Sequence, residues 1–171
     1  MPEAPVENIQ LLCLDVDGVM TDGAIVIDDH GVESKRFHVR DGTGIKIWTA
    51  LGFDLAIITG RRGMAVQHRA AELGIQHVRQ GASDKLAPFH ELLNTLDLKP
   101  SQAAMLGDDL PDLPIMNLAG YPMAVGDAVA EVRDAARFVT LRPGGHAAVR
   151  EAIEHLLRAK RRWDDAKALF H

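Results

Sequence analysis

The chain is 171 residues long, which is enough for one domain with a hydrophobic core of its own. Hydrophobic residues make up 47% of it and charged residues 25%, a balance typical of folded globular proteins, and no apolar run reaches the roughly 18 residues that a membrane-spanning helix needs. The formal net charge of −5 argues against nucleic acid as the main partner, so neither a membrane nor a nucleic acid is expected to be bound.

The N-terminal residues and the cysteine content indicate the compartment. Residues 1–8 contain no basic residue and no apolar segment, so no signal peptide is expected there. Cys13 is the single cysteine and lies among apolar residues, so it cannot form an internal disulfide. These features predict a protein of the reducing cytoplasm.

Short apolar segments alternate with helical patterns along the chain. Six of them are expected to be strands, at residues 9–14, 54–59, 76–80, 103–107, 121–124 and 137–140. Helices are expected at residues 44–51, 63–73, 84–96, 111–118 and 128–135, followed by a C-terminal helix and tail over about 146–171. Asp84 and Asp109 are expected to cap two of the helices, and Gly74 to end another. The alternation predicts one α/β domain over residues 1–171, with a doubly wound, mainly parallel sheet and helices on both faces.

One segment interrupts the alternation directly after the first strand. Residues 24–27 and 32–39 are apolar or loosely alternating, and residues 28–31 between them are typical of a turn. We therefore expect a β-hairpin insertion over about residues 23–38. Such an insertion covers an active site, forms a contact between subunits, or does both.

Two carboxylates stand two residues apart at the end of the first apolar segment. Asp15 follows the strand directly, and Asp17 is followed by Gly18. Ligands of doubly wound sheets bind at the carboxyl ends of the strands, so both carboxylates can face one crevice. Two acids so close together need a cation or a shared proton to coexist, which favours Mg²⁺. The alternative is an ordinary turn built from aspartate and glycine.

Two further motifs also follow predicted strands. Thr59 and Gly60 end the second strand, where a hydroxyl and backbone N–H groups can hold a phosphate at a helix entrance. Lys85 lies near the start of a helix, where its charge opposes the helix dipole, so a phosphate or a cluster of acids would explain its position. Taken alone, these residues are also compatible with an ordinary turn and a solvated surface lysine.

A second group of acids follows the fourth predicted strand. Asp108, Asp109 and Asp112 stand close together, and their mutual repulsion is costly without a cation. Mg²⁺ prefers oxygen ligands, so Asp15, the backbone carbonyl of Asp17 and Asp108 would form part of a magnesium shell. The simpler interpretation is a helix capped by Asp109 with solvated neighbours.

In this order, and each at a strand end, the motifs resemble those of the haloacid dehalogenase superfamily: Asp-x-Asp, a threonine or serine, a lysine and a closing pair of acids. The resemblance implies a phosphatase that forms an aspartyl phosphate on Asp15. It also implies that Asp17 protonates the leaving group and then activates water. Thr59 would hydrogen-bond to the phosphoryl group, and Lys85 would stabilise its charge.

The same resemblance assigns Mg²⁺ to Asp108 and the Asp-x-Asp motif, with Asp109 and Asp112 supporting the metal shell and Lys85. Two other classes of protein share parts of this pattern. A two-component receiver domain also phosphorylates an aspartate within a doubly wound sheet, but its acids come in a different order. A non-catalytic tetramerisation module of the same fold would lack catalytic positions, whereas none is missing here.

Longer segments resemble one family of the superfamily, the 3-deoxy-D-manno-octulosonate 8-phosphate phosphatases. These segments are residues 17–23, 37–45, 59–61 and 144–151. The resemblance implies hydrolysis of that acidic sugar phosphate in lipopolysaccharide precursor synthesis, and a homotetramer in which four hairpins assemble and a neighbour helps to close each site. His146-Ala147 departs slightly from the family pattern, which puts tail contacts with substrate in doubt. The basic tail, residues 158–163, is expected to be the solvated end of a helix.

An acidic sugar needs cations besides the metal. Arg61 is the first candidate for binding its carboxylate or phosphate, and Arg40 and Arg79 are others, although each could be an ordinary surface arginine. Thr21 and Gly60 complete the predicted substrate-binding set. Related phosphatases of a nonulosonate 9-phosphate carry an acid at the position of Arg61. The arginine therefore favours the octulosonate, and another sugar phosphate is the alternative.

Overall fold

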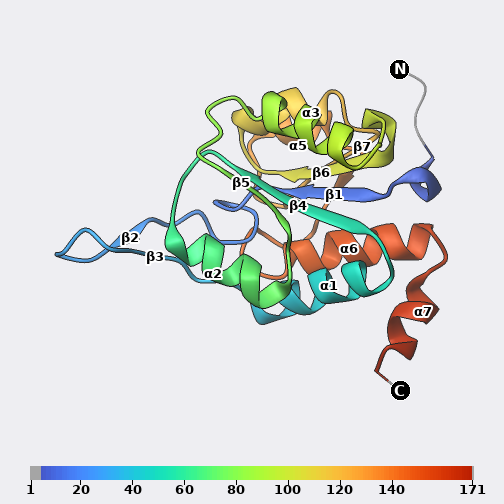
Figure 1. The fold of residues 1–171 in the computed structure, drawn as a ribbon, viewed down its shortest axis with the longest axis horizontal. Coiled ribbons are helices and arrows are strands. Elements are labelled where there is room, and N and C mark those ends of the chain that lie inside the picture. The colour runs from blue at the N-terminus through green and yellow to red at the C-terminus, as the bar shows by residue number, and fades with distance from the viewer. Residues whose placement is uncertain (1–4, 171) are drawn as a thin grey trace.

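The computed structural model describes residues 5–170. Residues 1–4, part of the segment in which no signal peptide is expected, and residue 171 of the predicted tail lie outside the described residues. The centre of the domain is a six-stranded parallel sheet with the strand order β5-β4-β1-β6-β7-β8 (Figure 1). Its strands are β1 (Leu11–Leu14), β4 (Asp54–Thr59), β5 (His77–Gln80), β6 (Ala103–Gly107), β7 (Tyr121–Ala124) and β8 (Phe138–Val139). The predicted doubly wound, mainly parallel sheet is confirmed.

The predicted strands differ from the sheet only at their ends. Strands β4, β6 and β7 have the predicted bounds. Strand β1 begins at Leu11 rather than at residue 9, although Gln10 still donates to the Gln102 carbonyl (2.7 Å) and accepts from the Asp54 N–H (2.9 Å) beside the ladder. Strand β8 is shorter than expected, because it lies at the sheet edge and pairs with β7 alone. Such one- or two-residue differences are usual at element ends.

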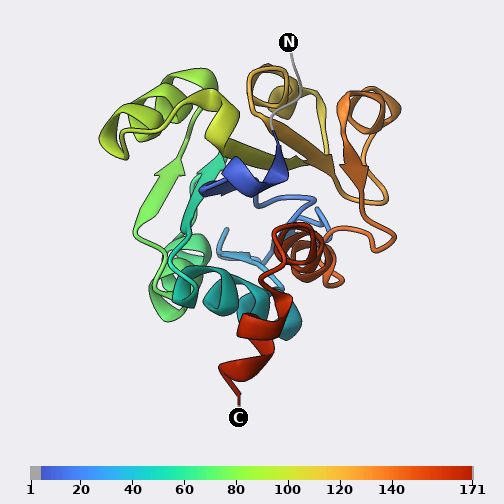
Figure 2. The same ribbon diagram turned by 90° about the vertical axis from the view of Figure 1, so that its right-hand side faces the viewer.

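Helices cover both faces of the sheet (Figures 1 and 2). One face carries α1 (Val39–Ala50), α2 (Met64–Leu73) and α6 (Ala148–Ala159), and the other carries α3 (Leu86–Thr95), α4 (Leu113–Met116) and α5 (Ala130–Ala135). The described residues also contain three 3₁₀ turns: η1 (Val6–Asn8), η2 (Pro100–Gln102) and η3 (Leu110–Asp112). The predicted helix over residues 111–118 is thus divided into η3 and α4, since Pro111 and Pro114 lack the N–H groups that a continuous helix needs.

Helix α1 begins at Val39, five residues earlier than predicted. Gly42 and Gly44 lower the helix propensity of its first turns, which hid them in the sequence. In the structure Gly44 lies against α6, and an added Cβ there would be 3.2 Å from the Arg150 Cα. The buried carboxylate of Asp41 accepts the Arg150 N–H (2.8 Å) at the start of α6. The close packing of α1 on α6 therefore outweighs the weak propensity.

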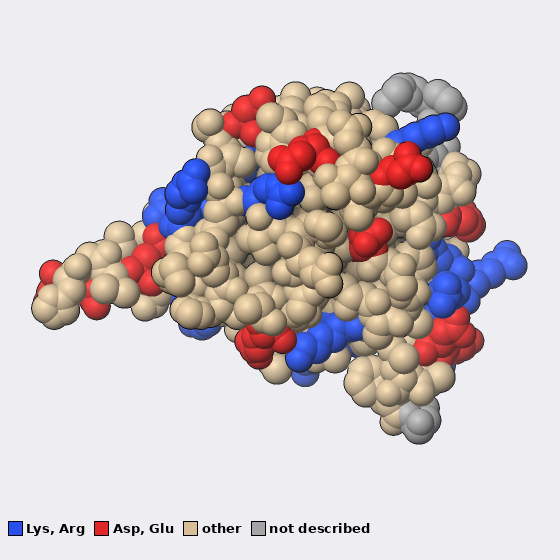
Figure 3. All heavy atoms as spheres, in the orientation of Figure 1, with Lys and Arg blue, Asp and Glu red and all other residues tan. Residues whose placement is uncertain are grey.

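The predicted hairpin follows β1 and projects from the body of the domain (Figures 1 and 3). Its strands, β2 (Val26–Ile27) and β3 (Glu33–Ser34), are shorter than expected, and its second limb ends where α1 begins. The Asp28 Oδ1 closes the turn by accepting the N–H groups of His30 (2.9 Å) and Val32 (2.8 Å). Four apolar side chains of the hairpin are more than half exposed: Ile25, Val26, Ile27 and Val32.

The loop between β1 and the hairpin is built around Thr21 and backed by the segment before α6. The Thr21 hydroxyl accepts the Gly18 N–H (3.4 Å), and the Gly145 N–H donates to the Val19 carbonyl (2.9 Å). Gly144 lies so close to this loop that a Cβ would be 1.7 Å from the Gly18 oxygen. Backbone-to-backbone contact therefore fixes the chain directly after the two predicted catalytic acids.

The C-terminal part of the chain forms α7 (Trp163–Ala168), at the end of the sheet opposite the hairpin (Figure 1). The Arg158 guanidinium lies 4.7 Å from the centre of the Trp163 ring, and Lys160 Nζ donates to the Glu7 carbonyl (2.8 Å). The basic segment lies at the end of α6 with Arg158 and Arg161 exposed, as predicted, while Trp163 and Lys160 contact the rest of the domain. Among residues 5–170, no helix is both long and apolar enough to cross a membrane.

Gly144→Ala is expected to destabilise the protein, because the added methyl group would overlap the backbone at Gly18. We expect the free energy of unfolding, measured with urea, to fall by about 3 kcal/mol. Gly63→Ala is the matched control, since nothing lies within 4 Å of its Cβ position and its φ of −171° suits any residue. Equal stability of the two variants would contradict the close approach.

Candidate active site

A pocket of about 260 Å³ opens at the carboxyl ends of β1, β4 and β6. Asp15 follows β1 directly, Thr59 ends β4, and Asp108 follows β6. Strands β1 and β6 are neighbours in the sheet although far apart in the chain, so the pocket lies at a topological switch point of the fold. Nine of the predicted site residues line it: Asp15, Asp17, Thr59, Gly60, Arg61, Lys85, Asp108, Asp109 and Asp112.

Lys85 lies between two buried carboxylates. Its Nζ is 3.0 Å from Asp15 Oδ1 and 2.7 Å from Asp112 Oδ1, and none of the three side chains is more than 10% exposed. Burial alone lowers the pKa of Lys85, but the charges of Asp15 and Asp112 outweigh burial, so the pKa lies above its usual value. Lys85 is therefore a buried ammonium that joins two acids and not a solvated surface lysine.

Three carboxylates, those of Asp15, Asp108 and Asp112, have oxygen atoms within 4.8 Å of one another. Burial raises the pKa of Asp15 to about 6, and the charge of Asp112 adds to this effect while Lys85 opposes it. Burial raises the pKa of Asp108 to about 8, and the charges of Asp15, Asp112 and Asp109 add to this effect. The buried Asp108 Oδ1 has no hydrogen-bond partner among the described residues. Mutually repelling carboxylates with an unpaired oxygen fit the oxygen-ligand preference of Mg²⁺.

The loop after β6 ties Asp108 to the buried lysine through Asp112. The Asp112 Oδ2 accepts the Asp108 N–H (3.0 Å), while its Oδ1 bonds to Lys85. Gly107 leaves room for this carboxylate, since a Cβ there would lie 2.6 Å from the Asp112 Cβ. Asp109 is exposed and accepts the N–H of its neighbour Leu110 (2.8 Å), which is the capping contact expected from the sequence.

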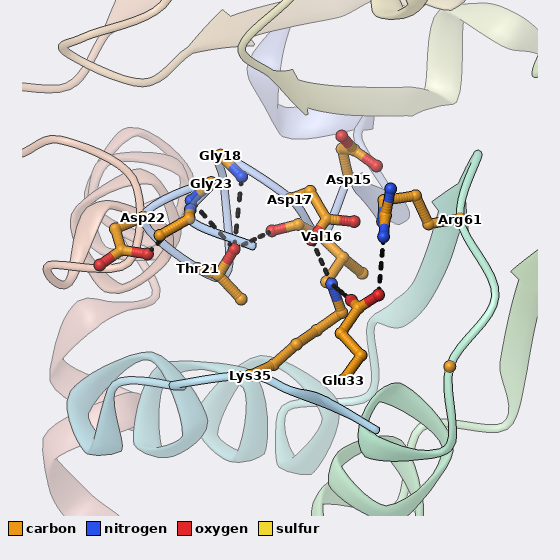
Figure 4. A network of polar contacts seen from close by, with 12 residues as sticks. Asp15, Val16, Asp17, Gly18, Thr21, Asp22, Gly23, Glu33, Lys35 and Arg61 are labelled. Carbon is orange, nitrogen blue, oxygen red and sulfur yellow. Dashed lines mark hydrogen bonds and ion pairs between the residues drawn. The ribbon is translucent and has the colours of Figure 1, made fainter. Parts of the chain in front are cut away.

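The hairpin contributes two charged side chains that sequence reasoning missed (Figure 4). Lys35 pairs with both Asp17 and Glu33, and Arg61 Nη2 donates to Glu33 Oε2 (2.7 Å). The available signal was the spacing of Glu33 and Lys35, because side chains two residues apart leave a strand on the same face. The spacing alone does not predict which face of the hairpin turns toward the pocket, because that depends on how the hairpin packs on its own domain.

Three predicted substrate-binding residues do not line the pocket of a single chain. The Thr21 hydroxyl is buried and is used within its own loop, where it also donates to the Val16 carbonyl (3.4 Å). Arg79 pairs with Glu91 of α3 (2.8 Å), and Arg40 lies exposed in the first turn of α1. These residues are close to the motifs in sequence, but the elements that carry them do not present them to the pocket.

The doubly wound sheet, the Asp-x-Asp turn after β1 and the acidic loop after β6 define a hydrolase of the haloacid dehalogenase-like class, whose family model matches residues 77–153. The 3-deoxy-D-manno-octulosonate 8-phosphate phosphatase of Yersinia pestis is 48% identical over 162 residues, which cover 95% of this chain and 87% of the relative. Its crystal structure matches with a TM-score of 0.92 at 47% identity, covering 94% and 86% of the two chains. The Moraxella catarrhalis phosphatase, solved with magnesium, phosphate and KDO, matches with a TM-score of 0.94 at 40% identity, covering 98% and 96%. The chain belongs to the family of 3-deoxy-D-manno-octulosonate 8-phosphate phosphatases.

The raised pKa values predict how the metal-free protein responds to pH. The folded-state pKa values of Asp15 and Asp108, about 6 and about 8, exceed the ordinary value of 3.8. The folded state therefore binds more protons than the unfolded state, so this part of the stability is complete below about pH 4 and is lost as pH rises to about 8.

We expect the melting temperature of the wild type in EDTA to fall between about pH 5 and pH 8, relative to that of Asp108→Asn. Saturating Mg²⁺ should raise the wild-type melting temperature most at the higher pH, because the cation offsets repulsion between ionised carboxylates. Asp108→Asn should show a much smaller response to Mg²⁺. A wild type whose relative stability increases with pH in EDTA would contradict this account.

Proposed function

We propose that this protein hydrolyses 3-deoxy-D-manno-octulosonate 8-phosphate to the free sugar acid and phosphate, with Mg²⁺, in lipopolysaccharide precursor synthesis. The observation that carries the proposal is the buried Lys85 between Asp15 and Asp112, beside the loop that holds Asp108. A carboxylate nucleophile, a fixed positive charge and oxygen ligands for a cation share one pocket. The similarity to octulosonate 8-phosphate phosphatases over nearly the whole chain supports the choice of sugar.

Asp15 performs the first step of the reaction. One of its carboxylate oxygens attacks phosphorus, the bond between phosphorus and the sugar oxygen breaks, and an aspartyl phosphate forms. The Lys85 ammonium, 3.0 Å from Asp15 Oδ1, offsets the charge of the phosphoryl oxygens. Thr59, buried at the end of β4, donates a hydrogen bond to the same group. The positions of these three residues around one pocket support this division of roles.

Asp17 transfers the protons. It protonates the sugar oxygen as that oxygen leaves, and it then takes a proton from the water that attacks the aspartyl phosphate, which releases phosphate and restores Asp15. The Asp17 Oδ2 is buried and has no hydrogen-bond partner among the described residues, which supports a role toward the substrate. Its other oxygen, Oδ1, pairs with Lys35.

Asp15, Asp108 and the backbone carbonyl of Asp17 hold Mg²⁺ in this proposal, and Asp109 and Asp112 support the loop that carries Asp108. When bound, the ion supplies positive charge that polarises the phosphoryl group. The unpaired oxygen and raised pKa of Asp108 support this assignment. The Asp17 carboxylate is outside the cluster of close carboxylate oxygens, which agrees with a ligand from its backbone instead.

Arg61 recognises the acidic sugar. It is the one arginine among the described residues that line the pocket, and its side chain is 45% exposed, so part of the guanidinium is open to a ligand. Gly60 lines the pocket beside it and leaves space, since it has no side chain. Contacts of substrate with Thr21, Arg40 or Arg79 of the same chain are not part of this proposal.

The protein forms a homotetramer through the hairpin defined by β2 and β3, and a neighbouring chain helps to close each pocket. A projecting hairpin with two paired residues in each strand is marginally stable by itself. Its exposed apolar side chains favour contact with another copy, and symmetric copies of one surface can cover each other. Figure 3 shows this part of the surface extending away from the body, with acidic side chains toward its tip.

The protein is cytoplasmic. Cys13 is buried in the middle of β1, and burial raises the pKa of its thiol to about 12. Such a thiol is unreactive and behaves as a small core residue. A single core cysteine agrees with a reducing compartment.

The activity is tested by phosphate release from a panel of sugar phosphates, with and without Mg²⁺. We expect Mg²⁺-dependent turnover with a preference for the octulosonate 8-phosphate. Asp15→Asn should lower kcat at least about a thousandfold, because the nucleophile is lost. Asp134→Asn, the same change at an exposed position on α5, is the control and should leave kcat unchanged. Equal turnover of several sugars would remove the substrate assignment, and no turnover of any phosphate would overturn the function.

The assembly is tested by light scattering. Val26→Asp places a charge in the exposed apolar row of the hairpin and is expected to convert tetramers into smaller species. Leu169→Asp is the matched control, because Leu169 is also exposed but lies at the end of α7, opposite the hairpin. A wild-type protein that is monomeric at micromolar concentration would refute the tetramer.

A further inference from the structure

Four charged side chains form a continuous row of ion pairs that connects the pocket with the hairpin (Figure 4). Arg61 Nη2 lies 2.7 Å from Glu33 Oε2, the other oxygen of Glu33 pairs with Lys35, and Lys35 pairs with Asp17 Oδ1. Positive and negative charges alternate along the row and sum to zero. The two end members line the pocket, whereas Glu33 and Lys35 stand behind them on the hairpin.

The burial of Lys35 sets it apart from the rest of the hairpin. Its side chain is 2% exposed, whereas that of the next residue, Arg36, is 80% exposed and pairs with Asp22 on the loop after β1. A buried ammonium is stable only with anionic partners close by, and the two that it has are Asp17 and Glu33 among the described residues. Lys35 is therefore held in one place, and it holds those partners in turn.

The consequence for Asp17 is a fixed orientation. A short carboxylate side chain can rotate so that either oxygen faces the pocket. With Oδ1 bound to Lys35, the oxygen left for the substrate is Oδ2, which is buried and has no protein partner in the described structure. Glu33 acts similarly on Arg61, since it holds one Nη of a guanidinium that is otherwise half exposed.

We propose that Lys35 and Glu33 are positioning residues, Lys35 for the proton-transferring Asp17 and Glu33 for the substrate-facing Arg61. Both act through another side chain. Glu33 lies on β3 and Lys35 follows that strand directly after Ser34, so one limb of the hairpin orients two groups of the pocket. The proposal rests on the function proposed above, because it takes Asp17 as the group that protonates the leaving oxygen. It gives the hairpin a role within its own chain, independent of contacts between subunits.

The test compares substrates that differ in their need for a proton. An alkyl phosphate, such as a sugar phosphate, leaves as a strongly basic alkoxide, whereas p-nitrophenyl phosphate leaves as a weakly basic phenolate. We expect Lys35→Met to lower kcat on the sugar phosphate about ten- to a hundredfold and kcat on p-nitrophenyl phosphate less than about threefold. Lys35→Arg, which can also pair with two carboxylates, should recover most of the loss.

Arg36→Met is the matched control, because it removes the same charge one residue further along the chain, from a side chain that faces solvent. Its ratio of alkyl to aryl turnover should equal that of the wild type. The melting temperature of each variant shows whether it is folded, and light scattering shows whether it assembles. A variant that passes both checks and still loses activity has lost the orientation of the Asp17 carboxylate. Lys35→Gln, which keeps a polar end without the charge, serves as the second variant if Lys35→Met does not fold.

Equal loss on both substrates, or failure of Lys35→Arg to restore the ratio, would overturn the role of Lys35. Glu33→Gln tests the other half: KM for the octulosonate phosphate should rise about three- to tenfold, with KM for p-nitrophenyl phosphate unchanged. A fall in that KM would mean that Glu33 competes for Arg61 instead of orienting it. If the wild type prefers another sugar phosphate, the substrate assignment fails, but the alkyl-to-aryl ratio still decides the role of Lys35.

Discussion

The ion pairs of Lys85 with Asp15 and Asp112 hold together a group of acids that would otherwise repel one another. These carboxylates follow strands far apart in the chain, and they are buried, so water screens their charges only weakly. Loss of a buried partner of this kind typically costs about 3–5 kcal/mol, because the remaining charges are left uncompensated. One lysine does not balance three acids, and burial together with the charges of the neighbouring acids raises the pKa of Asp108. The site is therefore built for a further cation.

The topology of the sheet makes this cluster possible. Strands β1 and β6 pair side by side, and the chain crosses to the other face of the sheet between them, so the turns after them diverge and leave a crevice. Glycines bring the surrounding backbone close: Gly144 lies against the loop after β1, and Gly107 makes room for the Asp112 carboxylate. Lys35 and Glu33 of the hairpin then pair with Asp17 and Arg61, which line this crevice. Rigid backbone contacts thus surround a pocket whose side chains carry strongly opposed charges.

Much of the fold and the site could be predicted from the sequence. Buried parallel strands appear in the sequence as short apolar segments, so β4, β6 and β7 were predicted with their observed bounds. Each polar motif stands at the end of such a run, and parallel strands of one sheet end at the same edge. That rule, together with the resemblance to the haloacid dehalogenase superfamily, predicted that Asp15, Thr59 and Asp108 would meet in one pocket, which they line in the structure. The element order and the chemical groups of the site were therefore determined locally.

Only the tertiary structure decided which way the remaining side chains face and what they contact. The first turn of α1 was missed because packing on α6 overrides the weak helix propensity of its glycines. The burial of Lys35 was not predicted, since it depends on how the hairpin folds over the loop after β1. Thr21, Arg40 and Arg79 stand near the motifs in sequence, yet they do not reach the pocket of their own chain. Local sequence sets the type and spacing of residues, whereas contacts between distant segments depend on the packing of the whole domain.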